Sequence, residues 1–125
     1  MKPTPTVTQY QNVEPYVTKD GSLIRELMHP SQHGNVNQSL AEAIVATGSE
    51  TDLHIHHVTE ELYYITQGCG MMKLGIDAFP VQTGDTILIP PNTPHSIKNT
   101  GTDELKILCC CSPAYAHDDT QLIED

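Results

Sequence analysis

The sequence predicts an all-β domain, a sandwich or barrel built from short strands. Runs of β-branched, aliphatic and aromatic residues recur at short, even spacing, and glycine or proline stands between them. No long amphipathic helical pattern interrupts these runs. The strands expected from this pattern cover residues 39–47, 53–57, 61–66, 71–74, 78–81, 86–89, 96–99 and 105–111.

Turn residues delimit the early elements. Asp20-Gly21 marks a turn, and the apolar positions of residues 22–28 that follow it fit a short helix as well as a strand. Residues 29–35 are polar and contain proline and glycine, so we expect a loop there. Gly48 closes the apolar strand that begins the regular part of the pattern.

The later elements are punctuated in the same way. Residues 71–74 and 78–81 form an expected hairpin around the turn at Gly75. The β-branched run 86–89 is followed directly by Pro90, which lacks the amide proton that a continuing strand needs. Each expected strand therefore has a chemical reason to end where it does.

Length bounds the domain organisation. A chain of 125 residues holds one domain, and it buries enough surface for a hydrophobic core without disulfides or other staples. We expect an extended arm over residues 1–20, a barrel domain over residues 21–112 and an acidic tail over residues 113–125.

Charge excludes several classes of partner. The formal net charge is −10, with only six lysine and arginine residues. Nucleic-acid backbones and anionic membrane surfaces require clustered cations, so neither is an expected partner. No apolar run approaches the roughly 18 residues that span a bilayer, and residues 1–20 contain no signal-peptide pattern. We therefore expect a cytoplasmic protein.

The four cysteines have no metal or redox spacing. Cys69 stands alone, and Cys109, Cys110 and Cys111 are consecutive. Neighbouring residues on a strand point to opposite faces, so the triplet cannot close one metal site, and no CxxC pair occurs. We interpret residues 107–111 as a small hydrophobic strand whose thiols stay reduced in the cytoplasm.

Histidines and one glutamate form a candidate metal site. His54 and His56 are two residues apart on an expected strand, so both imidazoles share a face and His57 takes the opposite one. Glu61 begins the next strand after a short connection, and His95 follows a proline-rich, rigid stretch. Three imidazoles and a carboxylate suit one divalent transition metal, namely Fe, Mn, Ni, Co, Cu or Zn, with coordination positions left open.

Two spaced patterns give this set a family context. The first begins at Gly48, continues after five residues with His54, one residue and His56, then four residues and Glu61, and ends six residues later at Gly68. This spacing resembles the first conserved motif of the cupins throughout. The six-residue gap to the final glycine selects Glu61, because the neighbouring Glu60 would leave seven.

The second pattern resembles the second cupin motif. It begins at Gly84, continues after five residues with Pro90, one residue and Asn92, then two residues and His95, and ends three residues later at Asn99. Asn92 departs from the glycine that the family usually has there. Asparagine tolerates left-handed backbone angles better than most residues, so we expect the turn to form.

The resemblance to a small single-domain cupin implies a double-stranded β-helix, also called a jelly-roll barrel, with the metal inside. In that family the two histidines of the first motif, its glutamate and the histidine of the second motif bind the ion. Transferred to this sequence, the metal ligands are His54, His56, Glu61 and His95.

Other polar residues carry simpler interpretations. We expect His29, His33, His57 and His117 in loops or on the surface. Tyr63 shares its strand face with the glutamate, so it fills the barrel with its ring or lines the cavity. Whether Glu42 is exposed or functional is left open by the pattern, as is the question of a cysteine facing the cavity. Asn99 has an expected backbone-bonding role, and Met71, Met72 and Phe79 are expected in the core.

Ligand set and fold together allow more than one function. The first is a metal-dependent enzyme, an oxidoreductase, isomerase or decarboxylase, acting on a small carboxylate, enolisable or sugar-like molecule. The alternative is a non-catalytic small-molecule-binding or sensor cupin with a structural metal. No catalytic acid or base is identified from the sequence. Exposed sheet edges favour pairing between copies, so we expect a homodimer.

Overall fold

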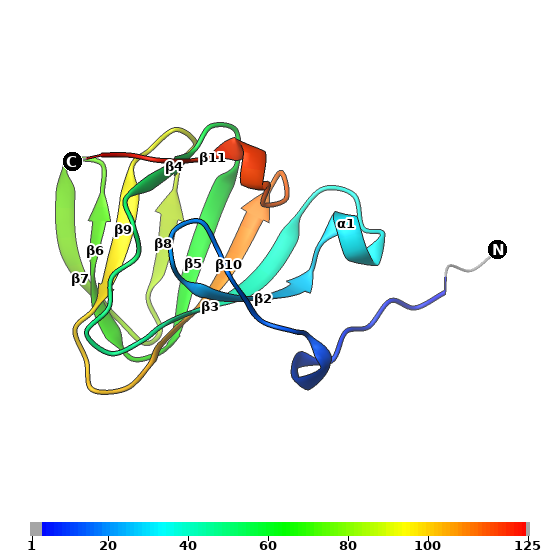
Figure 1. Cartoon of the computed structure of the whole chain (residues 1–125), viewed down its shortest axis with the longest axis horizontal. Helices are drawn as coiled ribbons and strands as arrows, with labels where there is room; N and C mark the ends of the chain where they lie inside the picture. Colours follow the sequence, from blue (N-terminus) through cyan, green and yellow to red (C-terminus); the bar gives the residue numbers. More distant parts are fainter. Residues whose placement is uncertain (1–3, 125) are drawn as a thin grey trace.

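The protein folds into two antiparallel β-sheets that face each other, as Figure 1 shows. The computed structural model describes residues 4–124. The six-stranded sheet has the order β1-β2-β3-β10-β5-β8. Its strands are β1 (Tyr16–Val17), β2 (Leu23–Met28), β3 (Ser39–Val45), β10 (Leu105–Ser112), β5 (Glu60–Gln67) and β8 (Thr86–Ile89).

The second sheet has five strands in the order β11-β4-β9-β6-β7. They are β11 (Thr120–Leu122), β4 (His54–His56), β9 (His95–Asn99), β6 (Cys69–Leu74) and β7 (Asp77–Gln82). Consecutive strands repeatedly cross from one sheet to the other, which is the arrangement of a jelly-roll or double-stranded β-helix. The predicted all-β fold is confirmed.

Alternation along the strands decides which side chains face the interior. In β5 every second residue from Glu61 to Ile65 is buried, and the residues between them are exposed. A shift of one residue would turn this whole set outward, so burial specifies the register strongly. The same alternation buries Cys109 and Cys111 of β10 and leaves Cys110 half-exposed, as the strand interpretation of the triplet requires.

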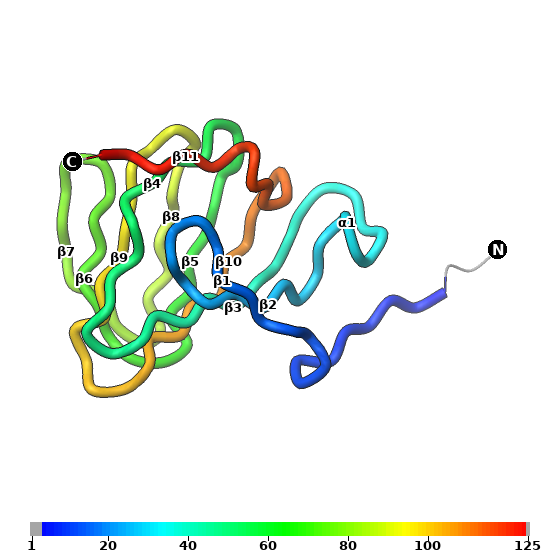
Figure 2. Tube along the Cα trace, in the orientation of Figure 1, coloured from blue at the N-terminus to red at the C-terminus, as the bar shows by residue number. Residues whose placement is uncertain are grey.

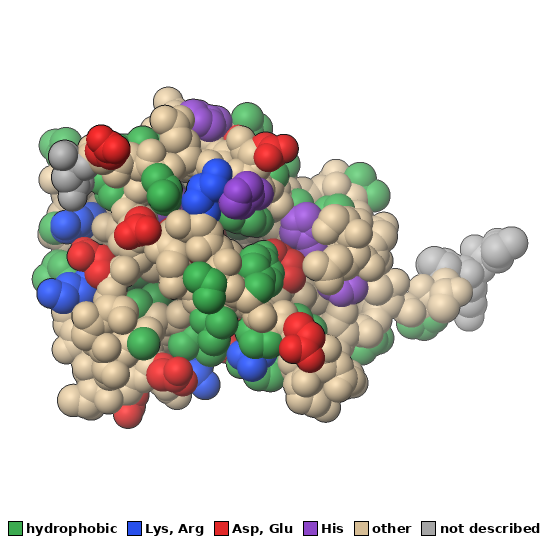
Figure 3. Space-filling view, in the orientation of Figure 1, with side chains coloured by type: hydrophobic (Ala, Val, Ile, Leu, Met, Phe, Trp, Pro, Cys, Tyr) green, Lys and Arg blue, Asp and Glu red, His purple; other side chains and the backbone are tan. Residues whose placement is uncertain are grey.

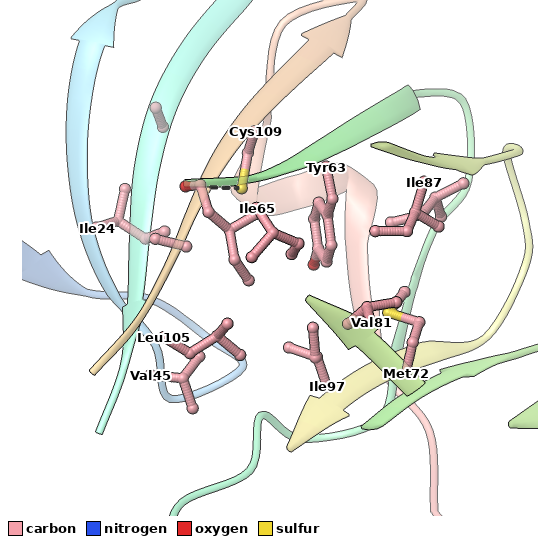
Figure 4. Close-up of a cluster of buried hydrophobic side chains, with 14 residues drawn as sticks. Ile24, Val45, Tyr63, Ile65, Met72, Val81, Ile87, Ile97, Leu105 and Cys109 are labelled. Carbon is pink, nitrogen blue, oxygen red and sulfur yellow. Dashed lines mark hydrogen bonds between the residues drawn. The ribbon is translucent and has the colours of Figure 1, made fainter. Parts of the chain in front are cut away.

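The apolar core lies between the sheets (Figure 4). Its best-buried members, none more than 1% exposed, are Ile65, Met72, Ile89, Ile97, Leu105 and Ile107. The prediction that Met71 belongs to this core is wrong. Met71 neighbours Met72 on β6 and therefore points to the opposite face, where it is exposed. Phe79 packs against the core while only partly buried.

The second motif forms its turn despite the asparagine. Asn92 has a φ of 60°, the left-handed region that glycine adopts freely and asparagine tolerates. The backbone N–H of Asn92 donates to the carbonyl of His56 at 2.6 Å, and this hydrogen bond connects the turn to β4. Asn99 donates to the carbonyls of Val45 and Asp103 and accepts from the amide of Gly101, so the expected structural role is confirmed.

The N-terminal third answers one question that the sequence left open and departs from one expected element. Residues 22–28, left open between helix and strand, form strand β2. The expected loop over residues 29–35 contains a short helix, α1 (Pro30–His33), whose first turn begins with proline, where a missing amide proton costs nothing. A single 3₁₀ turn, η1 (Tyr10–Asn12), precedes β1, and residues 1–3 of the expected arm lie outside the described residues.

The β1–β2 turn and the C-terminal segment both lie against the barrel. The β1–β2 turn arches over one end of the barrel in Figure 2, and the C-terminal segment runs alongside β4. That segment contains the 3₁₀ turn η2 (His117–Asp119) before β11. Figure 3 shows acidic side chains scattered over this face, with basic side chains interspersed among them. Among residues 4–124 no helix is long and apolar enough to cross a membrane.

Candidate metal centre

Three imidazoles from one sheet gather in the barrel interior, and Glu61 from the facing sheet approaches two of them. β4 pairs with β9 so that His54 lies directly opposite His95, and His56 shares the inward face of β4. One nitrogen from each of the three imidazoles lies within 4.8 Å of the others. Glu61, from β5 of the facing sheet, places Oε1 3.3 Å from Nε2 of His56 and 3.6 Å from Nε2 of His95. Glu60, the neighbouring glutamate that the motif spacing disfavours, is exposed.

Backbone carbonyls orient two of the imidazoles. Nδ1 of His54 lies 2.7 Å from the carbonyl oxygen of Asp52, and Nδ1 of His95 lies 2.9 Å from that of Thr93. A carbonyl can only accept, so each Nδ1 carries the proton and donates it. In the neutral ring Nε2 then keeps its lone pair and points towards the centre of the cluster.

The third imidazole is oriented by a hydroxyl on β11. Nδ1 of His56 lies 3.0 Å from Oγ1 of Thr120, and that hydroxyl donates its one proton to the carbonyl of Ala116 at 3.0 Å. Thr120 therefore accepts from His56, which again leaves Nε2 with the lone pair. This hydroxyl, 64 residues from the histidine in sequence, was not found by the motif analysis because only strand pairing brings the two together.

The cluster is buried, and two of its polar atoms have no hydrogen-bond partner among the described residues. His54, His56, Glu61 and His95 are 2%, 4%, 5% and 0% exposed. Oε1 of Glu61 and Nε2 of His95 are buried without a hydrogen-bond partner. Burial raises the pKa of the Glu61 carboxyl, but the neighbouring His56 and His95 outweigh burial and lower it, so the group is an anion. Nitrogen lone pairs and an anionic oxygen that face one another are stabilised by a positive charge between them, and the donor set could hold a divalent transition metal.

A thiol fixes the remaining oxygen of the glutamate. Sγ of Cys111 donates to Oε2 of Glu61 at 3.4 Å, which leaves Oε1 directed to the imidazoles. Burial raises the pKa of Cys111 and of Cys109, so both stay protonated thiols. Both line the cavity beside the cluster, as does Tyr63, whose ring meets His95 edge-on with 6.2 Å between centroids. The sequence left open whether a cysteine faces the cavity, and the structure shows that Cys109 and Cys111 do.

A second carboxylate at the cluster was not found by sequence reasoning. Oδ2 of Asp20, from the turn between β1 and β2, lies 3.5 Å from Nε2 of His54. Burial first, and then the neighbouring His95, lower the pKa of His54, although Asp20 and Asp52 act in the opposite direction. Asp20-Gly21 reads only as a turn in the sequence, and no motif spacing connects it with the histidines.

The cavity beside the cluster is small, and part of its lining is polar. Its open volume is about 40 Å³, and since one water needs roughly 10–15 Å³, it admits only a few water-sized groups. Glu26 and Tyr16 line it, and the hydroxyl of Tyr16 donates to Oε2 of Glu26 at 2.9 Å. Oε1 of Glu26 is buried without a partner. Burial raises the pKa of Glu26, with the Tyr16 hydrogen bond opposing it.

The remaining candidate residues lie away from the cluster. Glu42 accepts from the hydroxyl of Tyr10 and pairs with Arg25 at 3.9 Å on the outer side of the sheet. His57 and His117 are exposed, as expected. His29 differs from the solvated-loop expectation, because its Nε2 donates to the carbonyl of Tyr115 at 2.7 Å and so ties α1 to the C-terminal segment.

Comparison with known proteins gives the class. The cupin-domain family pattern matches residues 41–111, and the chain belongs to this family. The protein MJ1618 of Methanocaldococcus jannaschii is 56% identical over 117 residues, which is 94% of each chain. The oxalate-binding protein of Thermotoga maritima is 33% identical over 86 residues, 69% of this chain and 67% of that one.

Solved structures share the architecture. A predicted oxalate decarboxylase from Thermotoga maritima superposes with a TM-score of 0.75 and 25% identity, over 86% of this chain and 98% of the other. The Streptomyces nucleoside dehydratase Pac13 superposes with a TM-score of 0.78 over 97% of this chain and 92% of its own. At 19% identity, the likeness to Pac13 establishes the fold alone.

We expect the four thiols to separate into two reactivity classes. Cys69 and Cys110 are partly exposed, whereas Cys109 and Cys111 are buried and their raised pKa values keep them out of the reactive thiolate form. Alkylation of the native protein at neutral pH, followed by peptide mass spectrometry, should label the first pair at least about tenfold faster. Equal labelling of all four before unfolding would contradict the burial of the cavity thiols.

Proposed function

We propose that this cupin is a metal-dependent protein in which His54, His56, Glu61 and His95 hold one divalent transition metal. The observation that carries the proposal is the pre-oriented, buried donor set. Each Nδ1 is engaged by an acceptor, and Nε2 of His56 and of His95 face one oxygen of Glu61 that has no hydrogen-bond partner. Ligands held this rigidly by surrounding hydrogen bonds are typical of metal centres.

We further propose that the protein is an enzyme acting on a small organic carboxylate, enolisable or sugar-like molecule. A bound divalent ion would supply Lewis-acid or redox chemistry suited to isomerisation, decarboxylation or dioxygenation. The cavity restricts the reacting part of the molecule to a few non-hydrogen atoms. Glu26 presents an unpartnered, buried oxygen to that space, and Tyr16 holds its other oxygen in place. This carboxyl is our candidate for proton transfer to or from the substrate.

The alternative is a binding or sensor cupin that captures the same class of ligand without turnover. The resemblance to an oxalate-binding protein favours this alternative, since that relative is named for binding. The resemblance to a predicted oxalate decarboxylase favours the enzyme. The two functions share the donor set and differ in whether the bound molecule is converted.

Removing one donor of the proposed set should weaken metal binding. We expect His56→Ala and Glu61→Gln to lower the affinity for Mn²⁺ by at least about tenfold, because each removes a donor or the anionic charge of the set. The matched control is Glu60→Gln, which changes the exposed neighbour and should bind as the unaltered protein does. Isothermal titration of each purified chain measures the affinity. Equal affinity in His56→Ala and Glu60→Gln would contradict the assigned site.

Turnover distinguishes the two functions. Protein loaded with Fe²⁺ or Mn²⁺ without oxygen is mixed with short carboxylic acids, including oxalate, and followed by oxygen uptake and by product analysis. The enzyme proposal predicts conversion that Glu26→Gln lowers by about 10²-fold or more, with metal content unchanged. Binding of an acid, detected by calorimetry, without conversion of any of them would assign the protein to the binding class.

We also propose that two copies associate through the outer face of the six-stranded sheet. Leu40, Cys110, Leu62 and Leu88 lie side by side across four neighbouring strands. The three leucines are 38%, 41% and 52% exposed. A continuous apolar row on a sheet face favours pairing with a second copy of the same row about a two-fold axis.

Light scattering after size exclusion tests this pairing. The unaltered protein should have the mass of a dimer, and Leu62→Lys should shift it to the monomer, because a charge in the middle of an apolar contact is costly to bury. Ile76→Lys is the matched control, since Ile76 is fully exposed in the turn between β6 and β7. A monomeric unaltered protein, or a dimeric Leu62→Lys variant, would contradict the proposed interface.

A further inference from the structure

The turn that carries Asp20 holds its side chain in one orientation. Oδ1 of Asp20 accepts from Oγ1 of Thr18 at 2.7 Å, from the amide of Ser22 at 3.0 Å and from Oγ of Ser22 at 2.7 Å. Three donors on one oxygen fix the plane of the carboxylate. Oδ2 is left with a single close neighbour, Nε2 of His54 at 3.5 Å.

The same turn is fastened to the barrel on both sides. The carbonyl of Asp20 accepts from the amide of Asp52, two residues before His54, at 2.8 Å. Nζ of Lys19 donates to the carbonyl of Thr120 at 2.8 Å and to that of His117 at 3.3 Å. Thr120 is also the residue that orients His56. The turn is therefore connected to the segments that position two of the three imidazoles.

The carboxylates of Glu61 and Asp20 lie close to different histidines. Oε1 of Glu61 is close to Nε2 of His56 and of His95, at 3.3 and 3.6 Å, and Oδ2 of Asp20 is close to Nε2 of His54 at 3.5 Å. With metal–ligand bonds of about 2.0–2.1 Å, neighbouring donor atoms lie roughly 3.0–3.4 Å apart. All three oxygen–nitrogen distances are near this range.

The contact between Asp20 and His54 is stabilised by a positive charge in the same way as the contacts of Glu61. Nδ1 of His54 donates to the carbonyl of Asp52, so in the neutral ring Nε2 presents a lone pair to Oδ2 of Asp20. Two electron-rich atoms held face to face in a buried site repel each other unless a positive charge lies between them. The side chain of Asp20 is 12% exposed, so solvent screens it weakly.

We propose that Asp20 is an additional ligand of the metal centre, giving a set of three imidazoles and two carboxylates. This inference rests on the proposed metal site and extends it with a residue from outside both cupin motifs. Two carboxylates balance the charge of a divalent ion, so the completed centre is neutral and has one position fewer for a substrate. The β1–β2 turn then belongs to the site itself.

Asp20→Asn tests this assignment with minimal disturbance of the turn. The asparagine oxygen can still accept from Thr18 and Ser22, and only the oxygen facing His54 becomes an amide nitrogen. We expect the affinity for Mn²⁺ and Co²⁺ in calorimetric titration to fall at least tenfold, with thermal unfolding of the metal-free chain unchanged. Glu60→Gln, which removes a charge from an exposed residue beside Glu61, should bind within about twofold of the unaltered protein.

The outcomes separate this inference from the proposed function. If the unaltered protein takes up no stoichiometric metal, the metal site itself is wrong. If it binds metal and Asp20→Asn binds equally well, only the role of Asp20 is overturned. Equal weakening in Asp20→Asn and Glu60→Gln would reveal a general charge effect and would also overturn it.

A measurement on the unaltered protein does not depend on the folding of a variant. Infrared difference spectra with and without Zn²⁺ are recorded on protein with isotope-labelled aspartate carboxylates. Coordination by Asp20 predicts an isotope-shifted carboxylate band that appears on metal binding. Metal-induced bands that come only from unlabelled glutamate would overturn the assignment.

Discussion

The organising constraint of this molecule is the convergence of nitrogen lone pairs and an anionic oxygen in a space that is buried away from bulk solvent. Such an arrangement is unfavourable by itself, because buried polar atoms without partners cost free energy. It is held in place by hydrogen bonds that point each imidazole inward. His54 and His95 use backbone carbonyls, and His56 uses the hydroxyl of Thr120. The two sheets bring these groups together, and the rest of the fold keeps them there.

The interior of the barrel contains an apolar core and a separate cluster of polar side chains. The isoleucines, leucine and methionine that are most deeply buried fill one part of the space between the sheets, and the polar cluster occupies an end of it. Strand β5 contributes to both parts, since Glu61 and Ile65 share its inward face. A close-packed core has low compressibility, so the apolar part of the barrel gives the polar cluster a rigid support. The narrow cavity and the terminal segments that cover it limit what reaches the cluster.

Much of the fold and of the polar cluster could be predicted from local sequence patterns. The period of two along a strand placed His54 and His56 on one face, and motif spacing preferred Glu61 to Glu60. Local pattern fails where a role depends on contacts between distant segments. Asp20 and Thr120 reach the cluster only through the β1–β2 turn and the pairing of β11 with β4. Glu26 was hidden because residues 22–28 fitted helix and strand equally, so its face could not be assigned.

The central claim is that one ion sits among the four buried ligands, and it is tested most directly by a crystal structure of metal-loaded protein with anomalous scattering recorded at the absorption edge of the metal. The account predicts one strong anomalous peak inside the barrel, within about 0.2 Å of normal bonding distance from Nε2 of His54, His56 and His95 and from a carboxylate oxygen of Glu61. An interior without such a peak, or a peak bound only by surface side chains, would contradict it.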